Sequence, residues 1–139
     1  MYTDGAARGN PGPSASGFRI FRDGKLLHGD AVYNGMKTNN FAEYNAVILA
    51  LEWCLSNLDA PKETEIALFS DSELVVRQIN GHYRVKSTAL LHLNDRARRL
   101  SKEFKMVVFK NLPREHHGIS AVDKSLNALL DRISKEGEK

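Results

Sequence analysis

The chain has 139 residues, of which 42% are hydrophobic and 27% charged, and its formal net charge is +3. This length and composition predict a single domain with one core and exclude disordered and fibrous proteins. No apolar run is long enough to span a bilayer, and the first residues do not form a signal peptide, so we expect a cytoplasmic protein that does not bind membranes. The single cysteine, Cys54, excludes an intrachain disulfide and fits a reducing compartment.

The beginning of the chain predicts strands. Only Met1, Tyr2 and Thr3 precede Asp4, which makes a short first strand, since strands usually run about five or six residues. Alternating apolar and polar side chains predict a strand over residues 16–22. Asp23-Gly24 is a two-residue hairpin signal, so the residues that follow it form the returning strand.

The rest of the chain alternates helices and strands. A hairpin followed by this alternation predicts an α/β fold whose sheet has mixed strand directions. We expect Asp71 to cap the short second helix and Gly81 to close it. The predicted elements are the returning strand over residues 25–33, a helix over 41–58, a strand over 65–70, helices over 72–80 and 87–104, a strand over 106–109 and a helix over 120–134.

Four carboxylates stand at the ends of strands or on helices. Asp4 opens a Gly-rich stretch, Glu43 begins the long helix, Asp71 ends a strand, and Asp123 lies in the last helix. Taken singly, each could be an exposed or capping residue. Carboxylates that converge repel one another, so a fold that gathers them is typical of a cation site. Hard divalent cations such as Mg²⁺ are bound through carboxylates, water and phosphate oxygens.

The motifs around these carboxylates resemble a type 1 ribonuclease H, in particular the small form that lacks the basic handle. The resemblance extends from Met1 to about Asn127. It implies one ribonuclease H domain over residues 1–139, with a five-stranded mixed sheet in the order 3-2-1-4-5 and helices on both faces. The first strand is then central, and its shortness is unexpected. The motifs are TDGAARGNPG at residues 3–12, TNNFAEYNA at 38–46, SDSELVVRQING at 70–81 and PREHHGISAVDKSLN at 113–127.

The resemblance also implies a metal-dependent endonuclease that hydrolyses the RNA strand of RNA/DNA hybrids and leaves a 5′-phosphate and a 3′-hydroxyl. Two Mg²⁺ ions per site, with Mn²⁺ as the alternative, would activate water and neutralise the phosphate. In this reading Asp4 bridges both ions, and Asp71 and Asp123 each hold one. Glu43 binds an ion and also contacts the ribose of the cut strand.

Neutral polar groups are expected to recognise the substrate. By the same resemblance Gly9, Asn10, Asn39 and Asn40 approach the minor groove of the hybrid, where 2′-hydroxyls distinguish RNA from DNA. Individually, these residues could equally be turn or cap formers. Thr38 would help to hold a phosphate of the DNA strand, and Ser72 would line the site.

A basic excess between residues 84 and 114, nine basic side chains against two acidic, favours phosphate contacts. Lys86 and the Arg96, Arg98 and Arg99 side chains would partly replace the missing handle. We therefore expect a monomer whose partner is a hybrid duplex. Activity on double-stranded RNA is left open.

The segment between Pro113 and Asp123 is longer than the family pattern. A His or Arg in this segment assists catalysis in the family. Arg114 matches it when counted from Pro113, His116 matches it when counted back from Asp123, and His117 is a third option. Three alternative functions also stay open: a nucleic-acid-binding module without activity, another nuclease of the same superfold, and a ribonuclease H domain of a larger polyprotein.

Overall fold

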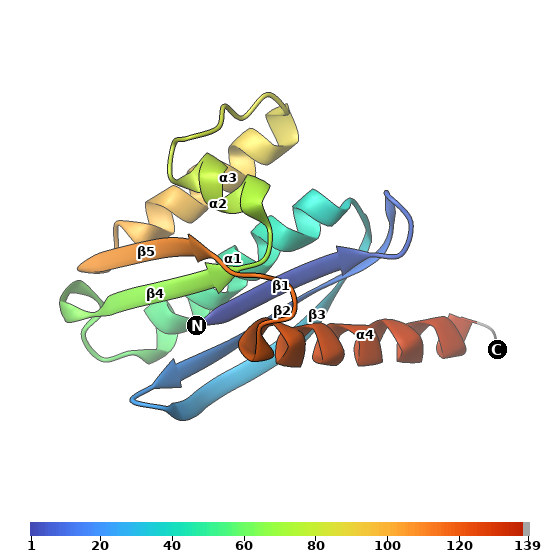
Figure 1. Cartoon of the computed structure of the whole chain (residues 1–139), viewed down its shortest axis with the longest axis horizontal. Coiled ribbons are helices and arrows are strands. Elements are labelled where there is room, and N and C mark those ends of the chain that lie inside the picture. Colours follow the sequence, from blue (N-terminus) through green and yellow to red (C-terminus); the bar gives the residue numbers. More distant parts are fainter. Residues whose placement is uncertain (138–139) are drawn as a thin grey trace.

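The computed structural model describes residues 1–137 and contains one five-stranded sheet in the order β3-β2-β1-β4-β5 (Figure 1). Strand β2 runs antiparallel to both of its neighbours, β1 and β3, whereas β4 and β5 run parallel to β1. The predicted strand order and mixed directions are thus confirmed. The elements are β1 (Tyr2–Ala7), β2 (Gly12–Arg22), β3 (Lys25–Lys37), α1 (Asn39–Asn57), a 3-10 turn (Pro61–Glu63), β4 (Glu65–Ser70), α2 (Glu73–Ile79), α3 (Thr88–Ser101), β5 (Met106–Asn111) and α4 (His117–Gly137).

Helices cover both faces of the sheet, and each face has its own apolar core (Figure 1). The larger core joins α1, α2 and α3 to one face and contains Leu51 and Leu68, which are fully buried. The smaller core joins α4 to the other face through Val122, Leu126 and Leu130. The sheet is therefore held from two sides, and β1 lies at its centre.

The first strand is longer than the sequence suggested. It continues past Asp4 through Gly5, Ala6 and Ala7, and it pairs with β2 over its whole length, from Tyr2 opposite Arg19 onward. The prediction of a clipped strand was therefore wrong, because small residues carry the strand into the Gly-rich stretch. Asp4 consequently lies inside a strand, where its backbone pairs with Gly17 of β2.

The starts of α2 and α4 also differ from the prediction. Ser72 rather than Asp71 caps α2, because the Ser72 Oγ accepts a hydrogen bond from the Val75 N–H at 3.2 Å. Helix α4 starts at His117, ahead of the predicted Ser120, since His116 caps it: Nδ1 of His116 accepts from the Gly118 N–H at 3.1 Å.

Within residues 1–137 no helix combines the length and apolarity that a membrane span requires.

Candidate active site

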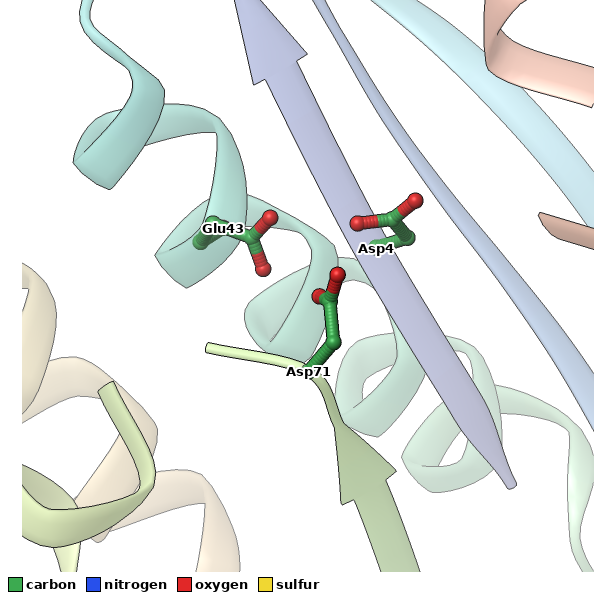
Figure 2. A group of neighbouring side chains, drawn as sticks. All are labelled: Asp4, Glu43 and Asp71. Carbon is green, nitrogen blue, oxygen red and sulfur yellow. The ribbon is translucent and has the colours of Figure 1, made fainter. Parts of the chain in front are cut away.

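The three carboxylates that converge lie where β4 leaves the sheet. Strand β4 pairs with β1 only as far as Thr3 opposite Ser70, so β1 has no neighbour on that side from Asp4 onward. Asp71 follows the end of β4, and Glu43 reaches the same place from α1 (Figure 2). One oxygen atom of each carboxylate lies within 4.8 Å of the others.

Gly5 lets α1 approach β1 closely enough to bring Glu43 to Asp4. A Cβ atom at Gly5 would overlap the backbone of Ala42 and Glu43, so only glycine fits between the strand and the helix. The Gly5 N–H donates to Asp4 Oδ1 at 2.9 Å and to Glu43 Oε1 at 3.1 Å. A single backbone group therefore holds both carboxylates.

Asp4 and Glu43 are buried, Asp71 is half-buried, and the three carboxylates have few hydrogen-bond donors around them. Asp4 and Glu43 are only 4% and 9% exposed, and the Ser70 hydroxyl donates to Glu43 Oε2 over a long 3.5 Å. The buried Oδ1 of Asp71 has no hydrogen-bond partner within the described part of the chain. A buried charged oxygen without a partner is strongly unfavourable. An all-oxygen donor set with an unsatisfied member fits a hard divalent cation.

The pKa values follow from this crowding. Burial, with the negative charge of Asp71, raises the pKa of Asp4 to about 8. Burial and the charges of Asp4 and Asp71 raise the pKa of Glu43 well above its usual value. Burial also raises the pKa of Asp71, although a hydrogen bond with Asp4 and the positive charge of Arg114 oppose the shift. Protons and cations therefore compete for the same oxygen atoms.

Asp123 lies beside this triad rather than within it. It is half-buried on α4, and its charge contributes to the raised pKa values of Asp4 and Asp71. Its Oδ1 accepts a hydrogen bond from the Asn127 side chain at 3.1 Å. The structure thus brings three of the four predicted carboxylates together and places the fourth next to them.

The predicted substrate residues gather around the turn after β1 and the start of α1. Asn10 Oδ1 accepts from the Asn39 N–H at 3.0 Å, and Asn39 Oδ1 accepts from the Ala7 N–H at 2.8 Å. Thr38 caps α1 by accepting from the Phe41 N–H at 3.1 Å. The backbone of Gly9 has a φ of +97° in this turn, and Asn40 is half-buried in the first turn of α1.

The same side chains thus fulfil a structural role and face outward. In the described part of the chain, neither the Asn10 nor the Asn39 amide nitrogen has a protein partner, so both can donate to a ligand. Ser72 lies next to Asp71, with its hydroxyl occupied as the cap of α2.

The arginines of α3 are engaged within the protein. Arg96 pairs with Glu52 of α1 at 2.7 Å, Arg99 pairs with Asp95 at 2.9 Å, and Arg98 donates to the Gln78 carbonyl at 3.0 Å. Lys86 is exposed in the segment between α2 and α3. The basic excess of this stretch is therefore partly neutralised, and one of the partners, Glu52, lies far from it in the sequence.

The three candidates for an assisting residue have different surroundings. The His116 ring stacks on Tyr2 and His117, with ring centroids 5.5 and 4.4 Å away, while its Nδ1 caps α4. Arg114 is close enough to Asp71 for its charge to lower the pKa of that carboxyl. The charge of Arg114 thus influences Asp71, whereas His116 is held at the start of α4.

Two residues in contact with the site were not assigned a role from the sequence. Asn127 was read only as part of the last motif, although an Asn four residues after an Asp on a helix places the two side chains together. Arg8 crosses from the turn after β1 to α4, a contact between distant segments that local patterns do not show.

Comparison with known proteins identifies similar chains over nearly the whole length. The model of the family described as RNase H matches residues 1–136. A bifunctional protein of Mycobacterium tuberculosis is 34% identical over 97% of this chain and 36% of its own length. The chain spans only 36 to 61% of the length of the first curated relatives that it matches.

Solved structures agree with this similarity. RNase H1 from Halobacterium salinarum superposes with a TM-score of 0.86 and 35% identity, covering 94% of this chain and 96% of that one. LC11-RNase H1 in complex with an RNA/DNA hybrid superposes with a TM-score of 0.80 and 37% identity, covering 93% of this chain and 96% of that one.

Proposed function

The chain belongs to the ribonuclease H family, and on that premise we propose that it is a metal-dependent endonuclease that hydrolyses the RNA strand of RNA/DNA hybrids. The observation that carries this proposal is the convergence of three carboxylates, two of them buried and the half-buried third with an unsatisfied oxygen, at the open side of β1. The similarity to a structure bound to an RNA/DNA hybrid supports the choice of substrate.

The carboxylates would hold two Mg²⁺ ions, or Mn²⁺ ions in their place. When bound, such a pair supplies an activated water, charge neutralisation on the phosphate and assistance to the departing 3′ oxygen. As the family resemblance implies, Asp4 would serve both ions, whereas Asp71 and Asp123 would each serve one. Glu43 would also accept a hydrogen bond from the ribose of the cut strand. The products would carry a 5′-phosphate and a 3′-hydroxyl.

The polar groups at the turn after β1 would select the RNA strand. The amide nitrogens of Asn10 and Asn39 have no protein partner among the described residues and could donate to 2′-hydroxyls, which only the RNA strand carries. Gly9 would allow close approach of the backbone, and Asn40 would add a further polar contact. Outside the minor groove, Thr38 and Lys86 would contact backbone phosphates, and Ser72 would line the site.

Of the assisting candidates, Arg114 is the better placed to help the departing product, because its charge reaches Asp71. His116 would support the site by fixing the start of α4, the helix that carries Asp123. All of these groups come from one domain over residues 1–139, which we propose acts as a monomer.

Cleavage of matched duplexes tests this function. The protein is incubated with RNA/DNA, RNA/RNA and DNA/DNA duplexes of one sequence, with Mg²⁺, with Mn²⁺ or with EDTA. We expect internal cuts in the RNA strand of the hybrid, dependent on the cation, and an intact DNA duplex. Comparable cleavage of the DNA duplex would contradict the proposal. Tight hybrid binding without any cleavage would instead indicate a binding module.

A further inference from the structure

Asp123 is held by its own helix. The Asn127 side-chain nitrogen donates to Asp123 Oδ1 at 3.1 Å and to the Asp123 carbonyl at 2.9 Å. These two bonds use both hydrogens of the amide, so the carboxylate is fixed through one oxygen and the other oxygen is left for a ligand. Carboxylates that bind metals are commonly oriented by such hydrogen bonds.

Arg8 sets the orientation of the Asn127 amide. Its guanidinium donates to Asn127 Oδ1 and to the Asn127 carbonyl, each at 3.3 Å. A guanidinium can only donate and an ionised carboxylate can only accept. The amide must therefore turn its oxygen to Arg8 and its nitrogen to Asp123, and a flipped amide would lose both contacts.

Arg8 is itself held in place, although its ion pair is exposed. Asp131 of α4 pairs with the guanidinium at 2.6 Å, with side chains 40% and 63% exposed. Exposed pairs of this kind add little to stability. The backbone N–H of Arg8 donates to the Pro13 carbonyl at 2.8 Å, which anchors Arg8 in the same turn as Gly9 and Asn10.

We propose that Asn127, oriented by Arg8, is the positioning residue for Asp123, and that this chain of contacts couples the turn after β1 to the fourth carboxylate. The coupling rests on the function proposed above, in which the turn contacts the hybrid and Asp123 holds a cation. Displacement of the turn moves Arg8 and so changes the orientation of the Asn127 amide. The position of the Asp123 oxygen that is left for the cation changes with it. The turn that contacts the RNA and the carboxylate that holds the cation are thus connected through Arg8 and Asn127.

The test measures Mg²⁺ binding and catalysis separately. Calorimetric titration of the protein with Mg²⁺, without nucleic acid, is compared with the Mg²⁺ concentration that gives half-maximal hybrid cleavage. In Asn127→Ala we expect Mg²⁺ affinity to fall about tenfold in both measurements. The KM for the hybrid at saturating Mg²⁺ should stay within about twofold of the wild type. Alanine favours helices more than asparagine does, so α4 should remain folded.

Arg8→Ala is the second variant, and Arg8 lies in the turn between β1 and β2. We expect the Mg²⁺ affinity of Arg8→Ala to fall about threefold. The double variant with Asn127→Ala should bind Mg²⁺ no more weakly than Asn127→Ala alone, because the effects of two residues in one chain of contacts are not additive. Ser125→Ala is the matched control on α4, since its hydroxyl donates to the Ala121 carbonyl at 3.2 Å and not to Asp123.

Unchanged Mg²⁺ titrations in Asn127→Ala would overturn the positioning role. Fully additive effects of Arg8→Ala and Asn127→Ala would overturn the coupling to the turn. Failure of the proposed function would look different: the wild type would bind Mg²⁺ but leave the hybrid intact, while calorimetry would still decide whether Asn127 positions Asp123.

Discussion

At the scale of single residues, Asp71 is the member of the triad with the least support. Its Oδ1 is buried without a hydrogen-bond partner among residues 1–137, whereas Asp4 and Glu43 share the Gly5 N–H. Ser72 rather than Asp71 caps α2, so the start of that helix does not require the Asp71 carboxylate. Asp71 is therefore the position at which a role in cation binding separates most clearly from a role in stability.

The first prediction is that Asp71→Asn loses activity without losing stability. The amide keeps the shape but not the charge, so hybrid cleavage should fall by about three orders of magnitude or more. Melting curves with EDTA should show equal or slightly higher stability, because repulsion with Asp4 and Glu43 is removed. Added Mg²⁺ should stabilise the variant much less than the wild type. A folded variant with activity within about tenfold of the wild type would exclude this role.

Gly5 offers a second test at the same scale. Gly5→Ala should destabilise the protein by about 1–3 kcal/mol, because the new methyl group overlaps the Ala42 backbone and α1 must move. The displacement should also separate Glu43 from Asp4 and lower activity beyond the loss of folded protein. Urea denaturation and cleavage by the folded fraction measure the two effects.

Gly24→Ala is the control for this substitution. Gly24 has a φ of +80°, so alanine is strained there, but nothing lies within 4 Å of the added atom. Its hairpin turn joins β2 to β3, away from the carboxylates. We expect a similar loss of stability with unchanged turnover. Equal turnover in both folded variants would show that Gly5 does not set the carboxylate geometry.

At the scale of elements, the start of α4 links the assisting segment to Asp123. Stacking on Tyr2 and capping through Nδ1 fix His116, and Gly118 lets Tyr2 pack closely, since a Cβ atom there would overlap the Tyr2 ring. The contacts with Tyr2 join residues far apart in the sequence, whereas the cap is a local contact. They explain why α4 starts earlier than the local pattern indicated.

The third prediction separates capping from proton transfer at His116. Asn is a favoured N-cap but cannot shuttle a proton, so His116→Asn should keep both stability and most of the activity. His116→Ala should lose about 1 kcal/mol of stability. Arg114→Ala should instead reduce turnover with little change in stability. A folded His116→Asn variant with a large loss of turnover would assign the imidazole a catalytic role.

Local patterns predicted most of the elements but not their ends. The hairpin at Asp23-Gly24 and the alternation of helices and strands depend on turn residues and on the spacing of apolar residues, which are local features of the sequence. The extension of β1 to Ala7 depends on pairing with β2, and the passage of α1 over Gly5 depends on tertiary packing. The motifs identified the four acidic residues, but only the structure shows that Asp123 stands beside the other three.

At the scale of the whole molecule, a charged site is built into the centre of the sheet. Two apolar cores hold β1 from both faces, and this packing allows three carboxylates to be kept close despite their repulsion. The stability that packing supplies must offset the unfavourable ionisation of the site. The free energy of unfolding of the whole protein should therefore depend on pH and on divalent cations.

The last prediction concerns the pH dependence of stability without cations. Because the pKa of Asp4 is raised from 3.8 to about 8, the folded state binds more protons than the unfolded state between these pH values. The free energy of unfolding should then fall as pH rises through this window. The raised pKa values of Glu43 and Asp71 act in the same direction.

Denaturation with EDTA from pH 5 to pH 9 measures this slope. Asp4→Asn, which cannot ionise, should flatten the slope and be more stable than the wild type at the alkaline end. Saturating Mg²⁺ should reverse the trend in the wild type, since cations bind the ionised carboxylates and are favoured as pH rises. A slope that is the same in both proteins would show that the ionisation of Asp4 does not control stability. The Asp4→Asn variant should remain insensitive to Mg²⁺ if the triad is the site at which the cation binds.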